Sequence, residues 1–146
     1  MTQALATLAD LYRLGISSDV LAQSPRSGDT ATQSQAIDSA SEYALGKIGG
    51  RYKRPLVSWQ DDLRQAVCKL AAYELLCIRG FNPAAGADIN ILERRNQADA
   101  WLTSVARQEI SPDIVGAANQ SPQFDNPRIV TSIQQGWQNR AGRVIG

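Results

Sequence analysis

The chain has 146 residues, of which 43% are hydrophobic and 20% charged, and its formal net charge is +1. This length and apolar content suit one compact domain with a modest core. A net charge so close to zero gives no global attraction to nucleic acid or to an anionic membrane, so any such contact has to be local. Histidine is absent, which excludes histidine-based catalytic triads and histidine metal sites.

The two cysteines predict no disulfide and no metal site. Cys68 and Cys77 fall within one predicted helix, about 13 Å apart by the helical rise, which is beyond disulfide reach. Two thiols alone do not complete a structural zinc site, so we expect both to be packing residues. The N-terminus has no apolar or basic leader, and no segment approaches the roughly 20 apolar residues of a membrane span. We therefore expect a protein made in the cytoplasm, with no cofactor and no membrane contact.

The first half of the chain predicts one short and one long helix. Residues 7–14 place their leucines on one side, and Gly15 gives this short helix a natural end. Another brief turn is predicted at residues 18–22, and proline and glycine in SPRSGDT predict a loop after it. Asp29 or Thr30 is a candidate cap for a long helix that runs to about Gly49 and carries a stripe of mainly small residues.

The strongest helical pattern covers residues 58–79, and we expect the other segments to pack on it. Ser58 is the predicted cap, and Gly80 marks the end because it tolerates left-handed backbone geometry. Apolar residues recur at steps of three and four, which predicts a broad buried side. Its members are Leu63, Ala66, Val67, Leu70, Ala71, Leu75, Cys77 and Ile78.

A last helix is predicted after Asp88, its candidate cap, to about Gln108. Beyond Glu109 the composition turns to Asn, Gln, Ser and Pro, with few residues able to fill a core. The sequence thus predicts an all-α fold. Residues 1–110 would form a small bundle of about four helices, and residues 111–146 would form a linker and an extended C-terminal arm. Trp59 and Trp101 are expected to pack within the domain.

No group of residues predicts catalysis. Tyr73 and Glu74 are adjacent on a helix, so their side chains point about 100° apart and should not converge on one substrate. Asp61 and Asp62 sit in a first helical turn, where acidic residues have an ordinary electrostatic role. We therefore expect that the protein is not an enzyme.

A local basic cluster lies between Glu42 and Asp61, a stretch that holds no other acidic residue. Its members are Lys47, Arg51, Lys53 and Arg54. One interpretation is a solvated link between two helices. The other is that these charges, repeated around a ring of identical subunits, line a channel through which DNA passes without its sequence being read.

The C-terminal stretch from Arg128 contains three arginines, no acid, and spaced apolar residues with no internal core to receive them. It could be an end without fixed structure, a short strand, or an arm that orders on another protein. The candidate residues of such a binding arm are Arg128, Ile129, Val130, Ile133, Trp137, Arg140, Arg143, Val144 and Ile145.

Taken in chain order, the predicted helices and the links between them resemble those of the head-to-tail connector or adaptor proteins of tailed bacteriophages, including the Mu-like prophage branch. The resemblance covers roughly residues 5 to 111. It is carried by the RY-x-x-PL link, by the Ala72–Tyr73 step, and by apolar spacing in the last helix. The residues concerned are Arg51, Tyr52, Pro55, Leu56, Ala72, Tyr73, Ala98, Leu102 and Ala106.

The resemblance implies a structural virion protein at the head-tail junction. Such subunits form a ring, commonly of twelve copies, between the portal and a stopper or tail component, and DNA crosses the central opening. The C-terminal arm would then bind the portal protein. The alternative function is a small helical DNA-binding or regulatory module, which the basic link and the arginine-bearing tail would serve.

Overall fold

The computed structural model describes residues 3–117, which form six α-helices and one π-helical turn. The β-structure in these residues is limited to one isolated bridge. The all-α prediction is confirmed, with three long helices and four short elements in place of about four helices. The elements are α1 (Leu8–Asp10), η1 (Leu11–Gly15), α2 (Ser18–Leu21), α3 (Pro25–Gly28), α4 (Thr30–Ile48), α5 (Asp61–Arg79) and α6 (Gly86–Ala106).

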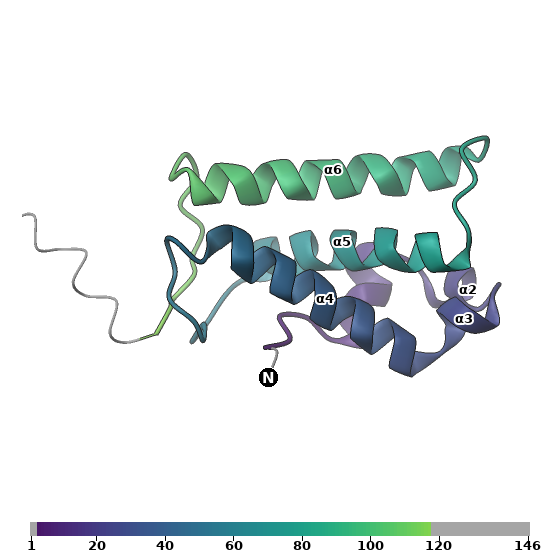
Figure 1. Cartoon of the computed structure of the whole chain (residues 1–146), viewed down its shortest axis with the longest axis horizontal. Coiled ribbons are helices and arrows are strands. Elements are labelled where there is room, and N and C mark those ends of the chain that lie inside the picture. Colours follow the sequence, from purple (N-terminus) through teal and green to yellow (C-terminus); the bar gives the residue numbers. More distant parts are fainter. Residues whose placement is uncertain (1–2, 118–146) are drawn as a thin grey trace, which may run out of the picture.

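The three long helices run along the long axis of the molecule, with α5 in the middle (Figure 1). Helix α6 lies above α5, and α4 crosses α5 obliquely, so that α4 and α6 diverge toward the end that carries α2 and α3 (Figure 1). Helix α5 packs against α4, α6 and η1, which confirms it as the central helix.

The buried side of α5 is broader than predicted. Six of the eight predicted core residues are buried. Another side of the helix is buried as well, because η1 and the short helices also cover α5; it carries Cys68, Ala72 and Leu76. Cys77 is exposed and Ile78 is 36% exposed, so the prediction was wrong for both. They lie in the last turns of α5, where α4 and α6 have moved apart (Figure 1).

The start of α5 differs from the prediction. Ser58 does not cap it: the helix begins at Asp61, and Gln60 precedes it without a side-chain capping bond. The Ser58 backbone instead pairs with Val115, whose N–H donates to the Ser58 carbonyl at 2.9 Å. The predicted end is confirmed, since Gly80 follows Arg79 with φ of 118°, a region that favours glycine.

The predicted N-terminal helix is confirmed and ends as a π turn. The Thr7 side chain accepts from the Asp10 N–H at 3.2 Å, and the Asp10 carboxylate accepts from the Thr7 N–H at 3.0 Å, a complete capping box. At Gly15 the chain touches α5 so closely that a Cβ would lie 2.7 Å from the Cys68 carbonyl oxygen. A side chain at this position would clash with α5, so the close contact favours glycine. The helix end itself does not use a left-handed glycine, because the residue that caps η1 is Ile16 in an extended conformation.

The loop predicted in SPRSGDT contains a one-turn helix, α3. The Ser24 hydroxyl accepts from the Arg26 N–H at 3.3 Å, and Pro25 occupies the first helical position, where a missing N–H costs nothing. Proline here starts a helix, so reading it only as a breaker was wrong. The brief turn predicted at residues 18–22 is confirmed as α2.

Asp88 is not the cap of the last helix. Helix α6 begins at Gly86, and Asp88 is buried inside its first turns, where its carboxylate accepts from Arg79 at 2.7 and 2.9 Å and from the Asn82 N–H at 2.9 Å. The Asn82 backbone bond and the Arg79 guanidinium hold the pKa of Asp88 below its ordinary value. This buried pair fixes the α5–α6 connection.

Both ends of the described chain pack against the link between α4 and α5. The Gln3 side-chain amide exchanges two hydrogen bonds with the Leu56 backbone, at 2.8 and 2.9 Å, and the Trp59 indole donates to the Leu5 carbonyl at 2.9 Å. Ile114, beyond α6, is buried in the core. Trp59 and Trp101 both pack against that core, as predicted. The division at residue 110 stays a prediction, since most of residues 111–146 lie outside the described chain.

Candidate functional site

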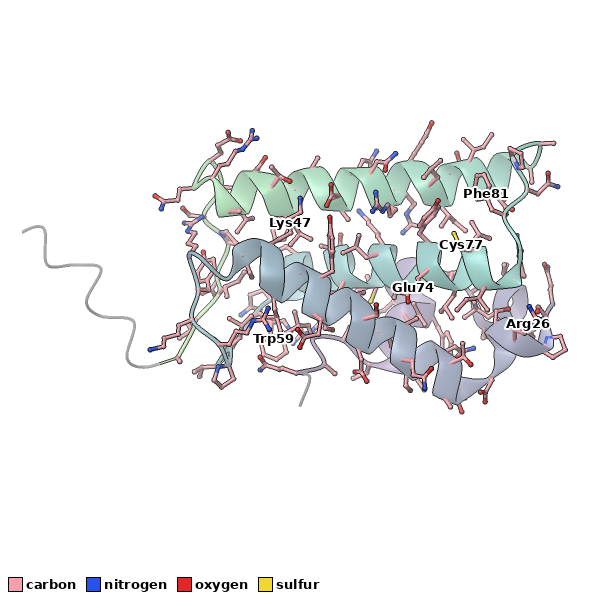
Figure 2. All side chains as sticks on the ribbon, in the orientation of Figure 1. Arg26, Lys47, Trp59, Glu74, Cys77 and Phe81 are labelled. Atoms are coloured by element: carbon pink, nitrogen blue, oxygen red, sulfur yellow. The ribbon has the colours of Figure 1, made fainter. Side chains whose placement is uncertain are left out.

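Lys47, the first member of the basic cluster, connects α4 to α6. Its ammonium lies 3.2 Å from an Asp99 carboxylate oxygen and donates to the Thr103 hydroxyl at 3.0 Å, so it points toward α6 (Figure 2). Tyr43 donates to the same carboxylate at 2.6 Å. The Tyr43 hydroxyl and then Lys47 lower the pKa of Asp99. A polar network, rather than apolar packing alone, joins these two helices.

Arg51 binds the C-terminal end of α6. Its guanidinium donates to the Val105 carbonyl at 2.9 Å, to the Ile110 carbonyl, and to the Ser111 hydroxyl at 2.8 Å. The Val105 carbonyl also accepts from the Gln108 N–H at 3.0 Å, and the partial negative charge at the C-terminal end of a helix favours a cation there. Arg51 is therefore occupied within its own subunit.

Arg54 and Lys53 lie on the link between α4 and α5. Arg54 forms an ion pair of 3.0 Å with Glu42, and both side chains are 44% exposed. Lys53 is exposed and has no ion pair among residues 3–117, although its carbonyl accepts from the Ala117 N–H at 2.9 Å. Three of the four cluster members thus have partners within the subunit, and their facing a DNA channel stays a prediction.

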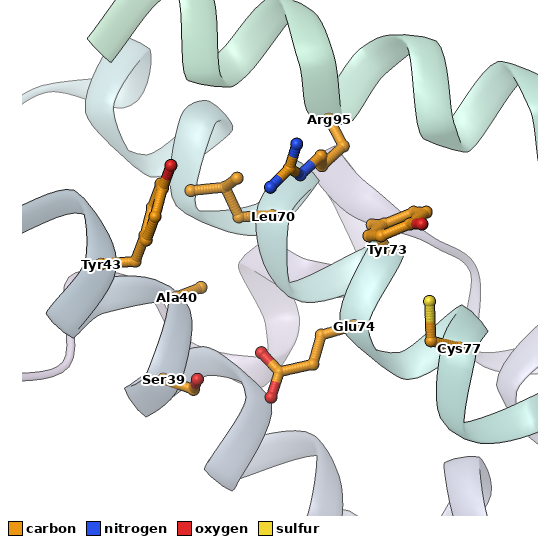
Figure 3. Close-up of a pocket in the computed structure, with 8 residues that line it drawn as sticks. All are labelled: Ser39, Ala40, Tyr43, Leu70, Tyr73, Glu74, Cys77 and Arg95. Atoms are coloured by element: carbon orange, nitrogen blue, oxygen red, sulfur yellow. The ribbon is translucent and has the colours of Figure 1, made fainter. Parts of the chain in front are cut away.

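A groove of about 290 Å³, here called the first groove, opens where α4, α5 and α6 diverge (Figure 3). Its walls combine apolar and aromatic side chains with one acid, one base and one thiol. The lining residues are Ser39, Ala40, Tyr43, Leu70, Tyr73, Glu74, Cys77 and Arg95. Tyr73 and Glu74 thus border one groove despite their adjacency, with the Glu74 carboxylate directed toward Ser39 and the Tyr73 ring beneath Arg95 (Figure 3).

The two charged residues of the first groove have no ion-pair partner among the described residues. Burial raises the pKa of Glu74, and the Ser39 hydroxyl acts in the opposite sense. The Arg95 guanidinium lies 5.7 Å from the centre of the Tyr73 ring and donates to the Asn96 side chain at 3.3 Å. The groove therefore holds a partly buried carboxylate and a guanidinium that a ligand could engage.

A second groove, of about 260 Å³, lies between α5 and α6 nearer the start of α5. It is lined by Asp62, Gln65, Ala66, Lys69, Gln97, Ala98 and Trp101. Trp101 contributes an aromatic wall that packs on the core. Lys69 is half-buried and forms no ion pair within residues 3–117. The sequence pattern had not indicated either groove, because both arise from how the long helices cross.

Metal binding has no support in the described part of the chain. Across residues 3–117, no three side chains of the types His, Cys, Asp and Glu gather at one place. Of the two adjacent acids, Asp61 pairs with Arg64 at 2.9 Å, and Asp62 accepts from the Leu63 N–H at 2.8 Å. These contacts are those of acids in a first helical turn. Within the same residues, none of the helices combines the length and apolar character needed to cross a bilayer.

The candidate arm residues from Arg128 to Ile145 lie outside the described residues, so the structure gives no geometry for them.

A family model described as Bacteriophage Mu, Gp36 matches residues 3–131. The chain belongs to this family. The match spans all of the described bundle and the first three candidate arm residues, and the expected likeness to Mu-like phage proteins is confirmed. No curated protein matches the chain.

Proposed function

We propose that this member of the Mu Gp36 family is a structural virion protein, a head-tail connector or adaptor that forms a ring between the portal and the tail or a stopper. The observation that carries the proposal is the family match over residues 3–131, because it makes the chain a phage protein along nearly its whole length. The geometry supports an assembly role in two further ways.

First, side-chain bonds fasten the long helices into one unit. Lys47 and Tyr43 join α4 to α6 through Asp99, and Arg51 joins the link to the end of α6. Charged groups that could have served a substrate are used instead to hold helices together. Such a bundle suits a protein that works by presenting fixed surfaces to its neighbours, and we propose that it carries out no catalysis and needs no cofactor.

Second, the link between α4 and α5 lies at one end of the bundle, together with the segment that follows α6 (Figure 1). We propose that this end faces the central channel, where Lys53 supplies the charge most available to passing DNA. One exposed lysine per subunit, repeated around a ring, attracts phosphate without reading sequence. The described chain also ends at this end of the bundle, and the C-terminal arm beyond it would bind the portal protein.

The proposal can be tested on purified phage particles. Quantitative mass spectrometry should find the protein in the particle at a copy number that is the same from particle to particle, and phage lacking its gene should accumulate heads and tails that do not join. Normal tailed particles without the protein would reject the assignment. A monomeric purified protein would not contradict it, because such a ring can require the portal as its template.

The alternative, a DNA-binding or regulatory module, makes a different prediction. A sequence-reading protein should bind its site with salt-sensitive, sequence-dependent affinity. A channel protein should bind unrelated duplexes weakly and equally as a free subunit. The engagement of Lys47, Arg51 and Arg54 within the subunit favours weak binding.

A further inference from the structure

The two grooves lie on different sides of α6. The first groove includes residues of α4, whereas the second is lined by α5 and α6 alone. On α6, Arg95 belongs to the first groove and Trp101 to the second. They are six residues apart, which at 3.6 residues per turn places their side chains about 120° apart around the helix. One subunit therefore presents two different concave surfaces on its two long flanks.

The charges of the two surfaces are complementary. The first groove carries Glu74 and Arg95, and the second carries Lys69 and Asp62. Neither Glu74 nor Lys69 has an ion-pair partner among residues 3–117. Each flank thus offers one acid and one base to a partner, and a long lysine side chain can reach into a groove from a facing surface.

Both surfaces also have the apolar content of a protein contact. Tyr43, at the edge of the first groove, is 42% exposed, and Trp101 borders the second. Aromatic residues beside a few charges are typical of the residues that carry binding energy at interfaces. A partner that covered the first groove would bury Tyr43 and would place a cation near a carboxylate whose burial now disfavours its charge.

We propose that the first groove of one copy binds the second-groove surface of the next copy, with Glu74 paired to Lys69 of the neighbouring copy and Arg95 to Asp62 of the neighbouring copy. This rests on the proposed ring. In a contact between two different surfaces, each newly added copy uses one surface and leaves the other free, so the contact propagates and can close into a ring. The contact uses the flanks of the bundle and leaves the link between α4 and α5 free to face the channel.

The alternative arrangement is a two-fold contact, in which the first grooves of two copies face each other. Glu74 of each copy would then pair with Arg95 of the other. Such a contact stops at a dimer. The chain carries a natural probe for this distinction. Cys77 is exposed and lines the first groove. Cys68 is buried, and burial raises its pKa to about 12, so both its inaccessibility and its protonation disfavour reaction with a maleimide.

Cross-linking of assembled particles tests the arrangement. Particles carrying Lys69→Cys would be treated with a short bifunctional maleimide, which should join Cys77 to the new thiol of the adjacent copy and give a ladder of dimers, trimers and larger species. Wild-type particles should give no ladder and no dimer. Arg26→Cys is the control, since Arg26 lies on α3 at the end of the bundle, and it should also give none (Figure 2).

Charge reversal provides a second, independent test. Glu74→Lys and Lys69→Glu should each lose incorporation into particles when supplied alone, because each places two like charges at every contact. An equal mixture of the two variants should regain incorporation, because alternating copies restore opposite charges. Arg26→Glu, a reversal of equal size at the end of the bundle, should incorporate normally.

The other outcomes would contradict the pairing or the proposed function. A cross-linked dimer in wild-type particles would show a two-fold contact and overturn the proposed pairing. A missing ladder in Lys69→Cys particles that contain the protein, or charge-reversed variants that incorporate normally, would also overturn the pairing while leaving the connector function intact. Absence of the wild-type protein from particles would overturn the proposed function and this inference with it.

Discussion

Arg51 fastens the end of α6 with three hydrogen bonds, two of them to main-chain carbonyls. Hydrogen bonds to a charged group contribute about 1.5–3 kcal/mol to stability. Arg51→Ala should therefore lower the free energy of unfolding by about 1.5–3 kcal/mol, measured by urea denaturation.

Arg54→Ala is the matched control, since Arg54 belongs to the same link and pairs with Glu42 through two side chains that are 44% exposed. Exposed pairs of this kind contribute about 0–1 kcal/mol. Equal losses for the two variants would show that Arg51 has no special part in ending α6.

Glu74 gives a pH-dependent prediction. Burial raises its pKa in the folded state, so the charged carboxylate destabilises the fold as the pH rises from the ordinary value of 4.5 through the folded value. Glu74→Gln removes that charge while keeping an acceptor for Ser39. The variant should unfold at higher urea concentration than the wild type at pH 7, and the difference should disappear below about pH 4.

Other carboxylates, such as Asp88 and Asp99, have lowered pKa values and lose their stabilising effect in acid, but they are common to both proteins. The difference between wild type and variant therefore reports on Glu74. Glu93→Gln, on an exposed part of α6, should leave the free energy of unfolding unchanged at both pH values. A Glu74→Gln variant less stable than the wild type at pH 7 would contradict the account of this groove.

Residue types could be read from the sequence, but their partners could not. The basic cluster was recognised as four nearby charges, yet Arg51 binds a carbonyl 54 positions away and Lys47 binds a hydroxyl 56 positions away. The first groove could not be predicted from the sequence for the same reason, because Tyr43, Glu74 and Arg95 come together only where three helices cross. Ser24 followed by Pro25 was a local signal for α3 that could have been used.

At the scale of elements, α5 offers a direct comparison of two leucine-sized side chains. Leu76 is fully buried, although the sequence pattern left it out, and Ile78 is 36% exposed, although the pattern included it. Leu76→Ala should lower the free energy of unfolding by about 2–5 kcal/mol because it leaves a cavity. Ile78→Ala should cost about 1–1.5 kcal/mol, because its side chain is only partly buried. Thermal or urea unfolding of both variants would check this, and the reverse order would show that the packing around the end of α5 is different.

The boundaries of α4 and the end of α5 were predictable because glycine and apolar spacing act within a few residues. The starts of α5 and α6 were not. Ser58 is held by Val115 across 57 positions, and Asp88 is drawn inward by Arg79 and by the backbone of Asn82. The polar groups of a candidate capping residue can bond either to the helix end or to a residue far away in the sequence. The sequence alone does not show which of the two bonds forms.

At the scale of the whole molecule, the bundle and the proposed arm should be separable. Deleting all residues after Asn126 should leave the melting temperature unchanged, because the core described above runs from Leu5 to Ile114. The same deletion should reduce attachment to particles if the arm binds the portal. Calorimetry and particle incorporation measure the two effects, and unfolding of the truncated protein would show that the last segment belongs to the domain.

We propose that this phage protein works as a ring at the head-tail junction. Imaging of purified particles by cryo-electron microscopy tests it most directly, since the helical bundle can be fitted into density beneath the portal. The account predicts a closed ring of this chain, with its flanks in contact and the link between α4 and α5 toward the channel. A junction fully explained by other proteins, with this chain elsewhere or missing, would contradict it.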